Sequence, residues 1–188
     1  MTFVITLEQQ ATLTEYSDEQ LVALCRHRWP VMSAAFTALI QRYQPAIYRF
    51  CLRYLRNESD AWDASQEVFT RVFRHLSGFV GRSSFRTWLY RIAQNQCHSL
   101  ARQRARYDDH EDIDTLDEFM EFQENRVDDD IEQMLRQLPA PDRDVLQLRF
   151  YQDLNLDEIA AALEIGLSAT KMRLYRALER LREIHERM

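Results

Sequence analysis

The chain has 188 residues, enough for one domain or two small ones. It contains only 3 Gly and 4 Pro, and 46% of its residues are hydrophobic, which favours an all-helical protein with short connections. No apolar run approaches the roughly 18 residues that a membrane-spanning helix needs. Residues 1–7 lack the basic flank and long apolar stretch of a signal peptide. We therefore expect a cytoplasmic protein with no direct insertion into a membrane.

The net charge of −6 conceals three segments of different charge. Residues 1–107 carry 14 Arg and 8 acidic residues, a net charge of +6. Residues 108–132 carry 13 acidic residues and one Arg, and residues 133–188 carry 9 basic and 9 acidic residues. A basic N-terminal segment suits a polyanionic partner, whereas the acidic segment is typical of a solvated linker.

Helical periodicity predicts four helices in the first part of the chain. Residues 17–20 form a capping-box pattern, which starts the first helix. Apolar residues then recur every three or four positions over residues 36–54, and Pro45 is expected to kink or split this helix. A polar break at residues 57–60 precedes the third helix. The fourth begins near Ser84 and ends in an arginine-rich run.

An acid-rich stretch separates this part from a second helical part. Residues 108–128 contain only short apolar spots, so we predict a flexible linker between a domain at residues 17–107 and a domain at residues 129–188. In the second domain, the apolar face of one helix is expected to consist of Ile131, Met134, Leu135 and Leu138, and that of the next helix of Val145, Leu146 and Phe150. No strand-like alternation stands out, so the predicted fold class is all-α.

The last 34 residues match a helix-turn-helix. Residues 155–158 form another capping box, residues 164–166 make a tight turn, and a second helix begins at Leu167 or Ser168. Its predicted inner residues are Leu174, Ala177, Leu178, Leu181 and Ile184. Its predicted outer residues, suited to phosphates or base edges, are Ser168, Lys171, Met172, Arg173, Tyr175 and Arg176. An ordinary helical hairpin with a solvated basic face is the alternative, and the short turn with the basic outer face favours DNA binding.

Three segments together carry a family resemblance. Residues 57–69 (NESDAWDASQEVF), residues 79–95 (FVGRSSFRTWLYRIAQN) and residues 138–182 resemble the extracytoplasmic-function sigma factors of the sigma-70 family. The resemblance covers nearly the whole chain in the same order, and only the first 16 residues lie outside it. Trp62, Glu164 and the run Ser168-Ala169-Thr170 depart from the family pattern. It implies a region-2-like domain, a region-4-like domain and promoter recognition.

The resemblance assigns the third predicted helix to polymerase binding. Its polar face is then expected to meet a coiled coil on the largest polymerase subunit. That face consists of Asp60, Asp63, Gln66, Glu67 and Thr70. Without the resemblance, the same pattern would favour a solvated acidic helix face.

Residues 79–90 interleave aromatic side chains with arginines, as strand opening requires. Aromatic rings stack with unpaired bases for roughly 1–3 kcal/mol each, and arginines hold the backbone. The loop at residues 79–84 is the candidate pocket for a flipped base, as the resemblance implies. Phe85 and Trp88 also fit a buried core stripe. The residues predicted for melting and downstream-element reading are Phe79, Arg82, Ser84, Arg86, Trp88, Asn95 and His98.

No enzyme pattern competes with this interpretation. The sequence has no Gly-rich phosphate loop, no His-x-x-x-His and no calcium-loop pattern, so we predict no catalytic residue, no cofactor and no metal. Cys25, Cys51 and Cys97 are expected to be small apolar fillers in a reduced compartment, with redox sensing by one of them left open.

The resemblance implies three partners: core RNA polymerase, promoter DNA and a membrane-linked anti-sigma factor, in control of a stress or envelope-related regulon. Two alternatives remain. A DNA-binding response regulator would need a receiver domain with a parallel sheet, and a helical adaptor would need no DNA contact. Neither explains the aromatic and arginine residues of the melting segment.

Overall fold

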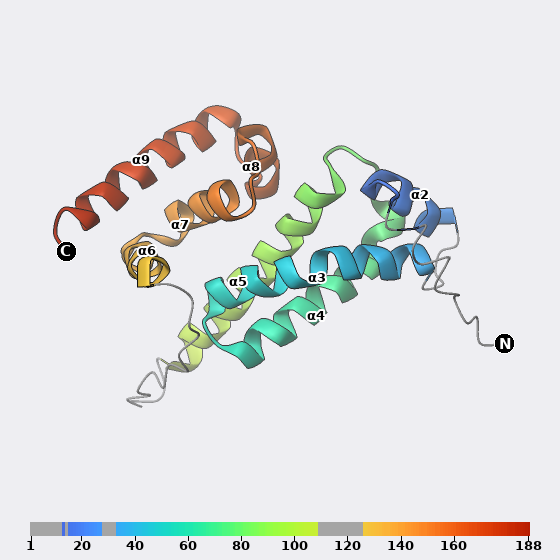
Figure 1. The fold of residues 1–188 in the computed structure, drawn as a ribbon, viewed down its shortest axis with the longest axis horizontal. Coiled ribbons are helices and arrows are strands. Elements are labelled where there is room, and N and C mark those ends of the chain that lie inside the picture. Colours follow the sequence, from blue (N-terminus) through green and yellow to red (C-terminus); the bar gives the residue numbers. More distant parts are fainter. Residues whose placement is uncertain (1–12, 14, 28–32, 109–125) are drawn as a thin grey trace. The chain divides into compact units, whose positions relative to one another are not determined.

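A computed structural model describes residue 13 and residues 15–27, 33–108 and 126–188. Every regular element in these described ranges is helical, which confirms the all-α prediction. Contacts between residues divide the chain into two compact units, Met1–Asp112 and Ile113–Met188. The first holds helices α2 to α5 and the second holds α6 to α9 (Figure 1).

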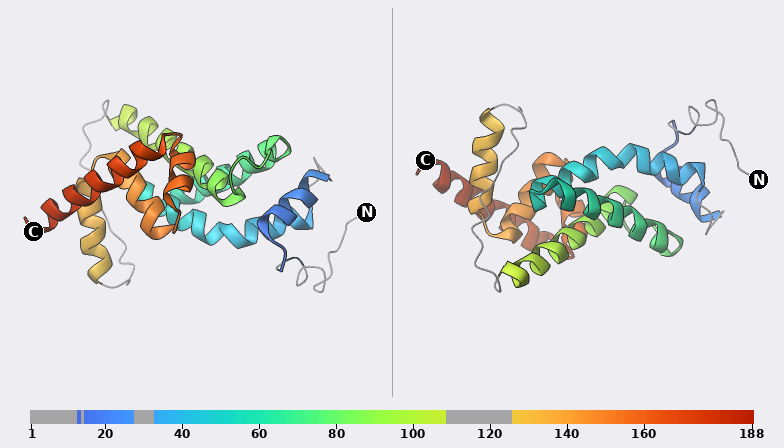
Figure 2. Two further views of the ribbon diagram at one scale, coloured as in Figure 1. Left: turned by 90° about the horizontal axis from the view of Figure 1, so that it is seen from above. Right: turned by 90° about the horizontal axis from the view of Figure 1, so that it is seen from below.

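The first unit is built on a helical hairpin. Helix α3 (Ala34–Leu55) packs along α4 (Glu58–His75), and α5 (Phe85–Asp108) lies against both. Figures 1 and 2 show these three helices side by side from every direction drawn. Apolar side chains of all three close the core, where Ile47, Val68 and Leu89 have no exposed surface. The shorter helix α2 (Asp18–His27) packs on α3, on α5 and on the one-turn helix η1 (Leu76–Gly78).

Polar side chains start these helices as the sequence predicted. The Asn57 side chain accepts a hydrogen bond from the Asp60 backbone N at 3.0 Å, and the Ser84 hydroxyl accepts one from the Thr87 backbone N at 3.1 Å. Each supplies an acceptor to a backbone N–H that has no partner within its own helix. The bounds of α4 and α5 are therefore fixed by local hydrogen bonding.

Pro45 does not split α3, which runs without interruption from Ala34 to Leu55. A proline removes one backbone hydrogen bond, and this costs an isolated helix about 3 kcal/mol. Here Leu39 and Ile47, on either side of the proline, are both buried. Packing against the neighbouring helices offsets the lost hydrogen bond, so the expected split is wrong, and the alternative of a kink stays a prediction.

In the second unit, α9 (Leu167–His185) packs against the other three helices. They are α6 (Arg126–Gln137), α7 (Ala140–Leu146) and α8 (Leu156–Leu163). A π-helical segment, η2 (Gln147–Tyr151), extends α7. Its wider turn shifts which residues face inward. Leu148 is consequently buried, whereas Phe150, predicted for the core, is 60% exposed.

The two helices of the predicted helix-turn-helix are present, with a tight turn. The Asn155 side chain and the Glu158 side chain each accept a backbone hydrogen bond at 2.9 Å, forming the predicted capping box at the start of α8. Glu164 ends α8 in the left-handed conformation with a φ of 54°. Helix α9 then begins at Leu167, as expected.

The inner face of α9 differs from the prediction at two residues. Ala177 and Ile184 are buried, and Leu174 and Leu181 are half-buried, as expected, but Leu178 is 38% exposed. Thr170 is fully buried instead, and its hydroxyl donates to the Gly166 carbonyl oxygen at 3.2 Å. The inner stripe therefore starts one turn earlier, at Thr170.

The structure leaves the predicted linker largely outside its described ranges. Helix α5 continues to Asp108 and α6 already begins at Arg126, so both ends of the predicted segment at residues 108–128 are helical. Residues 109–125 lie outside the described residues. The proposed domain limits of 17–107 and 129–188 therefore stay predictions.

Candidate polymerase and nucleic-acid interfaces

The predicted polymerase face of α4 is mostly exposed to solvent. Asp63, Gln66 and Thr70 are exposed, and Glu67 is half-buried. The Thr70 hydroxyl donates to the Gln66 carbonyl oxygen at 3.0 Å, and Glu67 forms an ion pair with Arg71, one turn further along, at 2.8 Å. These contacts stay within α4, so this face is open to a partner.

Asp60 differs from the other predicted polymerase residues because another helix already holds it. Its carboxylate forms an ion pair with Arg104 of α5. The Arg104 guanidinium also donates to the Leu55 carbonyl oxygen at 3.5 Å, at the end of α3. Arg104 thus joins the ends of α3 and α5 to the start of α4, and the structure gives Asp60 a role inside the unit.

Trp62 lies beside this face, and the sequence analysis assigned it no role. Its side chain is 51% exposed, and its ring lies edge-on to Tyr48 of α3 with centroids 6.2 Å apart. Large aromatic residues that stay exposed often anchor a partner protein. The departure from the family pattern at this position was the sequence signal that could have pointed to it.

The predicted melting loop rests on an aromatic cluster. The Phe79 ring lies 4.9 Å from the Trp88 ring and 6.3 Å from the Phe85 ring, centroid to centroid. Phe85 is buried, in agreement with the core alternative, whereas Phe79 and Trp88 are half-buried. Gly81 adopts a φ of 74°, which other residues rarely adopt, and the loop turns there. Phe79 and Trp88 thus offer partly open ring faces.

The remaining loop and α5 residues fall into two groups. Arg82 and Asn95 are exposed, whereas Arg86 and His98 are half-buried. The His98 ring lies 5.4 Å from the Tyr54 ring of α3. The Ser84 hydroxyl is engaged in starting α5, with Thr87 Oγ1 at 2.8 Å, so its local role is structural.

Arginines of α3 and α5 converge around one buried phenol. Burial raises the pKa of Tyr90 to about 12, and the positive charges of Arg86 and Arg49 oppose this rise. The two arginines therefore lie close to the same hydroxyl although they belong to different helices. Arg49 is exposed and was missed in the sequence analysis. Its signal was the spacing Arg42, Arg49 and Arg53, which places three arginines along one side of a helix.

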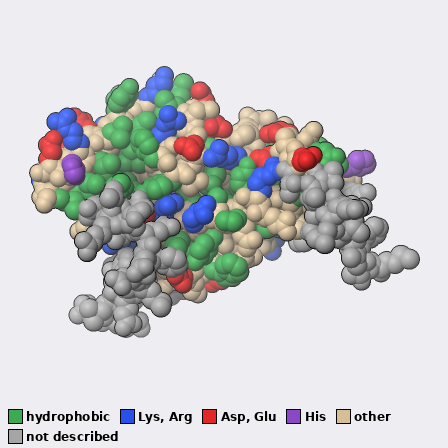
Figure 3. Space-filling view, viewed as in Figure 1, with side chains coloured by type: hydrophobic (Ala, Val, Ile, Leu, Met, Phe, Trp, Pro, Cys, Tyr) green, Lys and Arg blue, Asp and Glu red, His purple; other side chains and the backbone are tan. Residues whose placement is uncertain are grey.

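On α9 the predicted DNA-contacting residues form an exposed face with one exception. Met172 is 60% exposed and Tyr175 is 73% exposed. Arg173 is half-buried beside the inner stripe. The exposed polar residues of this face are Ser168, Lys171 and Arg176. Figure 3 shows basic and hydrophobic side chains next to each other on the visible side of the second unit. Such a surface can contact both phosphates and the methyl groups of thymines.

The helix-turn-helix is held to its own unit by a charged contact. Arg180 of α9 forms an ion pair with Asp142 of α7, and Asp142 is buried. This contact lies on the opposite end of α9 from the exposed Ser168. It fixes α9 in its unit without using the residues of the exposed face.

Comparison with known proteins decides the family. The family model for sigma-70 region 2 matches residues 39–107, and the model for sigma-70 region 4 matches residues 134–183. RNA polymerase sigma-H factor of Pseudomonas aeruginosa is 30% identical over 182 residues, covering 89% of this chain and 93% of that protein. ECF RNA polymerase sigma factor SigW of Bacillus subtilis is 32% identical over 164 residues, covering 79% and 88%. This chain belongs to the extracytoplasmic-function sigma factors.

Two solved structures share the fold of this chain. The structure of CnrH in complex with the cytosolic domain of CnrY has a TM-score of 0.69 and 23% identity, covering 90% of this chain and 97% of that one. The sigma factor RpoE of Bartonella quintana, in complex with the anti-sigma factor NepR, has a TM-score of 0.69 and 22% identity, covering 82% and 98%.

Membership of the family gives the two units their general functions. The sigma factor is not an enzyme; it binds core RNA polymerase and directs it to promoter DNA for initiation. Region 2 comprises most of α3 to α5, and region 4 comprises the end of α6 to α9. Among the described helices, none is both long and apolar enough to span a membrane.

Proposed function

We propose that three separate faces of this sigma factor divide the work of initiation. The exposed face of α4 binds polymerase, with Asp63, Gln66, Glu67 and Thr70 as its contacts and Trp62 at its edge. The loop at residues 79–84, with Trp88 and Asn95, captures bases of the opened strand. The exposed face of α9 reads the upstream promoter element.

The observation that carries this proposal is the separation of charge within the first unit. Helix α4 contains four acidic residues, whereas α3 contains none and α5 contains one, at its last position. Helix α5 alone carries five arginines. Opposite charges on different helices suit two different partners, because a polyanion is repelled by the acidic helix and attracted to the other two.

We also infer that an anti-sigma factor restrains this protein and that it acts in the cytoplasm, with polymerase. The similar fold of a sigma factor bound to an anti-sigma factor supports that inference. A stress or envelope-related regulon fits such control. A protein that binds the chain one-to-one and abolishes its transcription in vitro would identify this partner.

Run-off transcription tests the function as a whole. Core polymerase with the purified chain should start at defined positions on genomic fragments of the source organism, and core polymerase alone should not. Mapping the transcript ends gives the promoters directly. The same set of starts with and without the chain would contradict the proposal.

Asp63→Arg combined with Glu67→Arg should weaken binding to core polymerase by about tenfold, because like charges would then meet across the contact. Binding can be measured by titrating labelled chain with core polymerase. The matched control is Glu15→Arg with Glu19→Arg, which changes the net charge equally at exposed residues of the first unit. Equal affinities for both double variants would show that the α4 face is not part of the polymerase interface.

Phe79→Ala should impair strand opening while sparing the first binding of holoenzyme to the promoter. The ring lies on Trp88, and its loss removes a stacking platform worth roughly 1–3 kcal/mol. Permanganate reactivity of promoter thymines reports opening, and a filter or gel assay reports binding. Phe150→Ala, at a phenylalanine that is 60% exposed in the second unit, is the control. Unchanged thymine reactivity in Phe79→Ala would show that the loop takes no part.

Arg173 and Lys171 should affect promoter choice in different ways. If Arg173 reads a base, Arg173→Ala should flatten the preference at one upstream position, since a bidentate arginine–guanine pair contributes roughly 1–3 kcal/mol of discrimination. If Lys171 holds a phosphate, Lys171→Ala should weaken all promoters alike and lower the salt slope by about one. Transcription from a library of upstream elements at two salt concentrations measures both. An unaltered profile for both variants would mean that the exposed face of α9 contacts solvent and not the promoter.

A further inference from the structure

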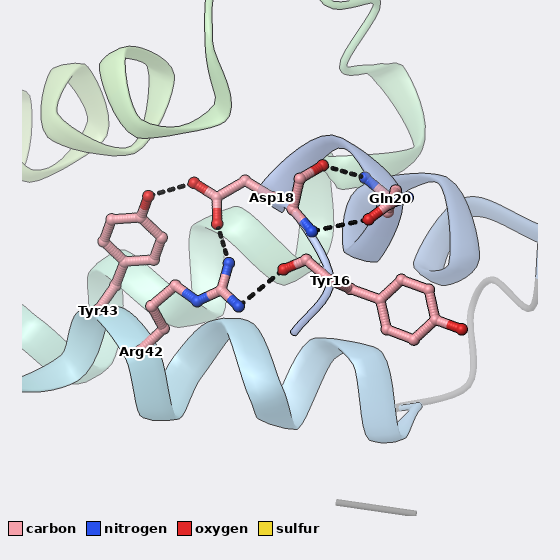
Figure 4. A network of polar contacts seen from close by, with 6 residues as sticks. Tyr16, Asp18, Gln20, Arg42 and Tyr43 are labelled. Carbon is pink, nitrogen blue, oxygen red and sulfur yellow. Dashed lines mark hydrogen bonds and ion pairs between the residues drawn. The ribbon is translucent and has the colours of Figure 1, made fainter. Parts of the chain in front are cut away.

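Three polar residues fasten α2 to α3. The Asp18 carboxylate accepts a hydrogen bond from the Tyr43 hydroxyl and forms an ion pair with the Arg42 guanidinium at 2.6 Å. Arg42 also donates to the Tyr16 carbonyl oxygen at 2.8 Å. Figure 4 shows the Asp18 carboxylate between the Tyr43 hydroxyl and the Arg42 side chain. Asp18 is the first residue of α2, so this network holds the N-terminal end of that helix against α3.

The Tyr43 side chain is suited to serve as a permanent donor in this network. Burial raises the pKa of its phenol well above the usual range, and the hydrogen bond to Asp18 raises the pKa further. The hydroxyl therefore stays protonated and donates to the Asp18 carboxylate, which also pairs with Arg42. A hydrogen bond to a charged acceptor is stronger than one between neutral groups.

The network is connected to the melting loop by two routes. Along the first, the Tyr43 ring lies 5.7 Å from the Phe85 ring, and Phe85 lies 6.3 Å from Phe79, centroid to centroid. Along the second, α2 itself packs on η1, which ends at Gly78 immediately before the loop, and on α5, which begins at Phe85 immediately after it. Helix α2 thus packs on the element that precedes the loop at residues 79–84 and on the helix that follows it.

We propose that Asp18 and Tyr43 are positioning residues for promoter opening: they hold α2 and Phe85 so that Phe79 and its loop stand ready to receive an unpaired base. Asp18 lies before the segment that the region 2 family model matches, whereas Tyr43 lies within it and its ring lies against Phe85. The proposal rests on the loop having the role in opening given above. Holding the loop in advance lowers the conformational cost of capturing a base.

The discriminating variants are Tyr43→Phe and Asp18→Asn. Tyr43→Phe removes only the hydroxyl and keeps the ring against Phe85. Both variants should bind core polymerase normally and slow opening of a duplex promoter by about threefold to tenfold, the usual size of such indirect coupling. On a promoter that already contains an unpaired bubble, transcription should return to the wild-type level, because strand separation is no longer required.

A control separates positioning from loss of stability. Ser17→Ala disturbs the start of α2 through the Gln20 backbone N, at 3.3 Å from the Ser17 hydroxyl, but leaves the Asp18 to Tyr43 contact intact. At a matched loss of thermal stability, Ser17→Ala should open duplex promoters normally. If it slows opening as much as Tyr43→Phe, or if the bubble template does not rescue Tyr43→Phe, the proposal is wrong.

Failure of this inference is distinguishable from failure of the proposed function. If Phe79→Ala impairs opening and Tyr43→Phe does not, the loop acts in opening without support from Asp18 and Tyr43. If neither variant changes opening, the role of the loop itself is excluded. Wild-type opening with the Asp18→Asn variant, together with impaired opening with Phe79→Ala, would likewise overturn the positioning role.

Discussion

The contact on which the first unit depends is the seam between α3 and α5. Three ring pairs mark it, Tyr43 with Phe85, Phe50 with Tyr90, and Tyr54 with His98, with centroids 5.7, 5.6 and 5.4 Å apart. Tilted or edge-on pairs of this kind add about 0.5–1.5 kcal/mol each to the burial of their area. The pairs follow the same order along both helices, so α5 must run parallel to α3. This fixes which of its faces remains exposed.

Two aspartates join helices at the two ends of the first unit. At one end Asp18 joins α2 to α3, and at the other Asp60 joins α4 to α5 through Arg104. Each is partly exposed, so the Coulombic gain is modest. Their effect is geometric, because each ties the end of one helix to the middle or end of another. The helices that bear the loop and the exposed α4 face are thereby joined to their neighbours at their ends.

The sequence predicted the helices well because their limits depend on local chemistry. Asn57 and Ser84 accept hydrogen bonds from backbone N–H groups within the next turn, and such signals can be recognised without knowing the fold. The spacing of apolar residues also identified the buried sides of α3 and α5. The predictions failed where a distant contact overrides the local pattern. Pro45 stays inside α3 because packing on both sides holds it, and Phe150 turns outward because η2 is π-helical.

The candidate sites were predicted less completely, for a related reason. The residues on one face of a helix can be identified from their spacing. The groups that bind each carboxylate or hydroxyl, however, come from other helices. Asp60 and Asp63 look equivalent in the sequence, three residues apart on one face. In the structure, Asp60 forms an ion pair with Arg104, whereas Asp63 is exposed. Nothing near Asp60 in the sequence indicates a partner 44 residues away. Ser84 likewise appeared suited to DNA, yet its hydroxyl starts α5.

The two units also differ in how they hold their exposed functional faces. In the second unit, the exposed side of α9 depends on small and apolar residues beneath it, with Ala177 and Thr170 fully buried. Arg173 is half-buried next to this stripe, so its stem is confined, whereas Lys171 is exposed. A confined arginine loses less conformational entropy when its guanidinium meets a base edge. Confinement therefore favours Arg173 as a source of sequence preference, and the exposed Lys171 is suited to phosphates, whose positions vary little with sequence.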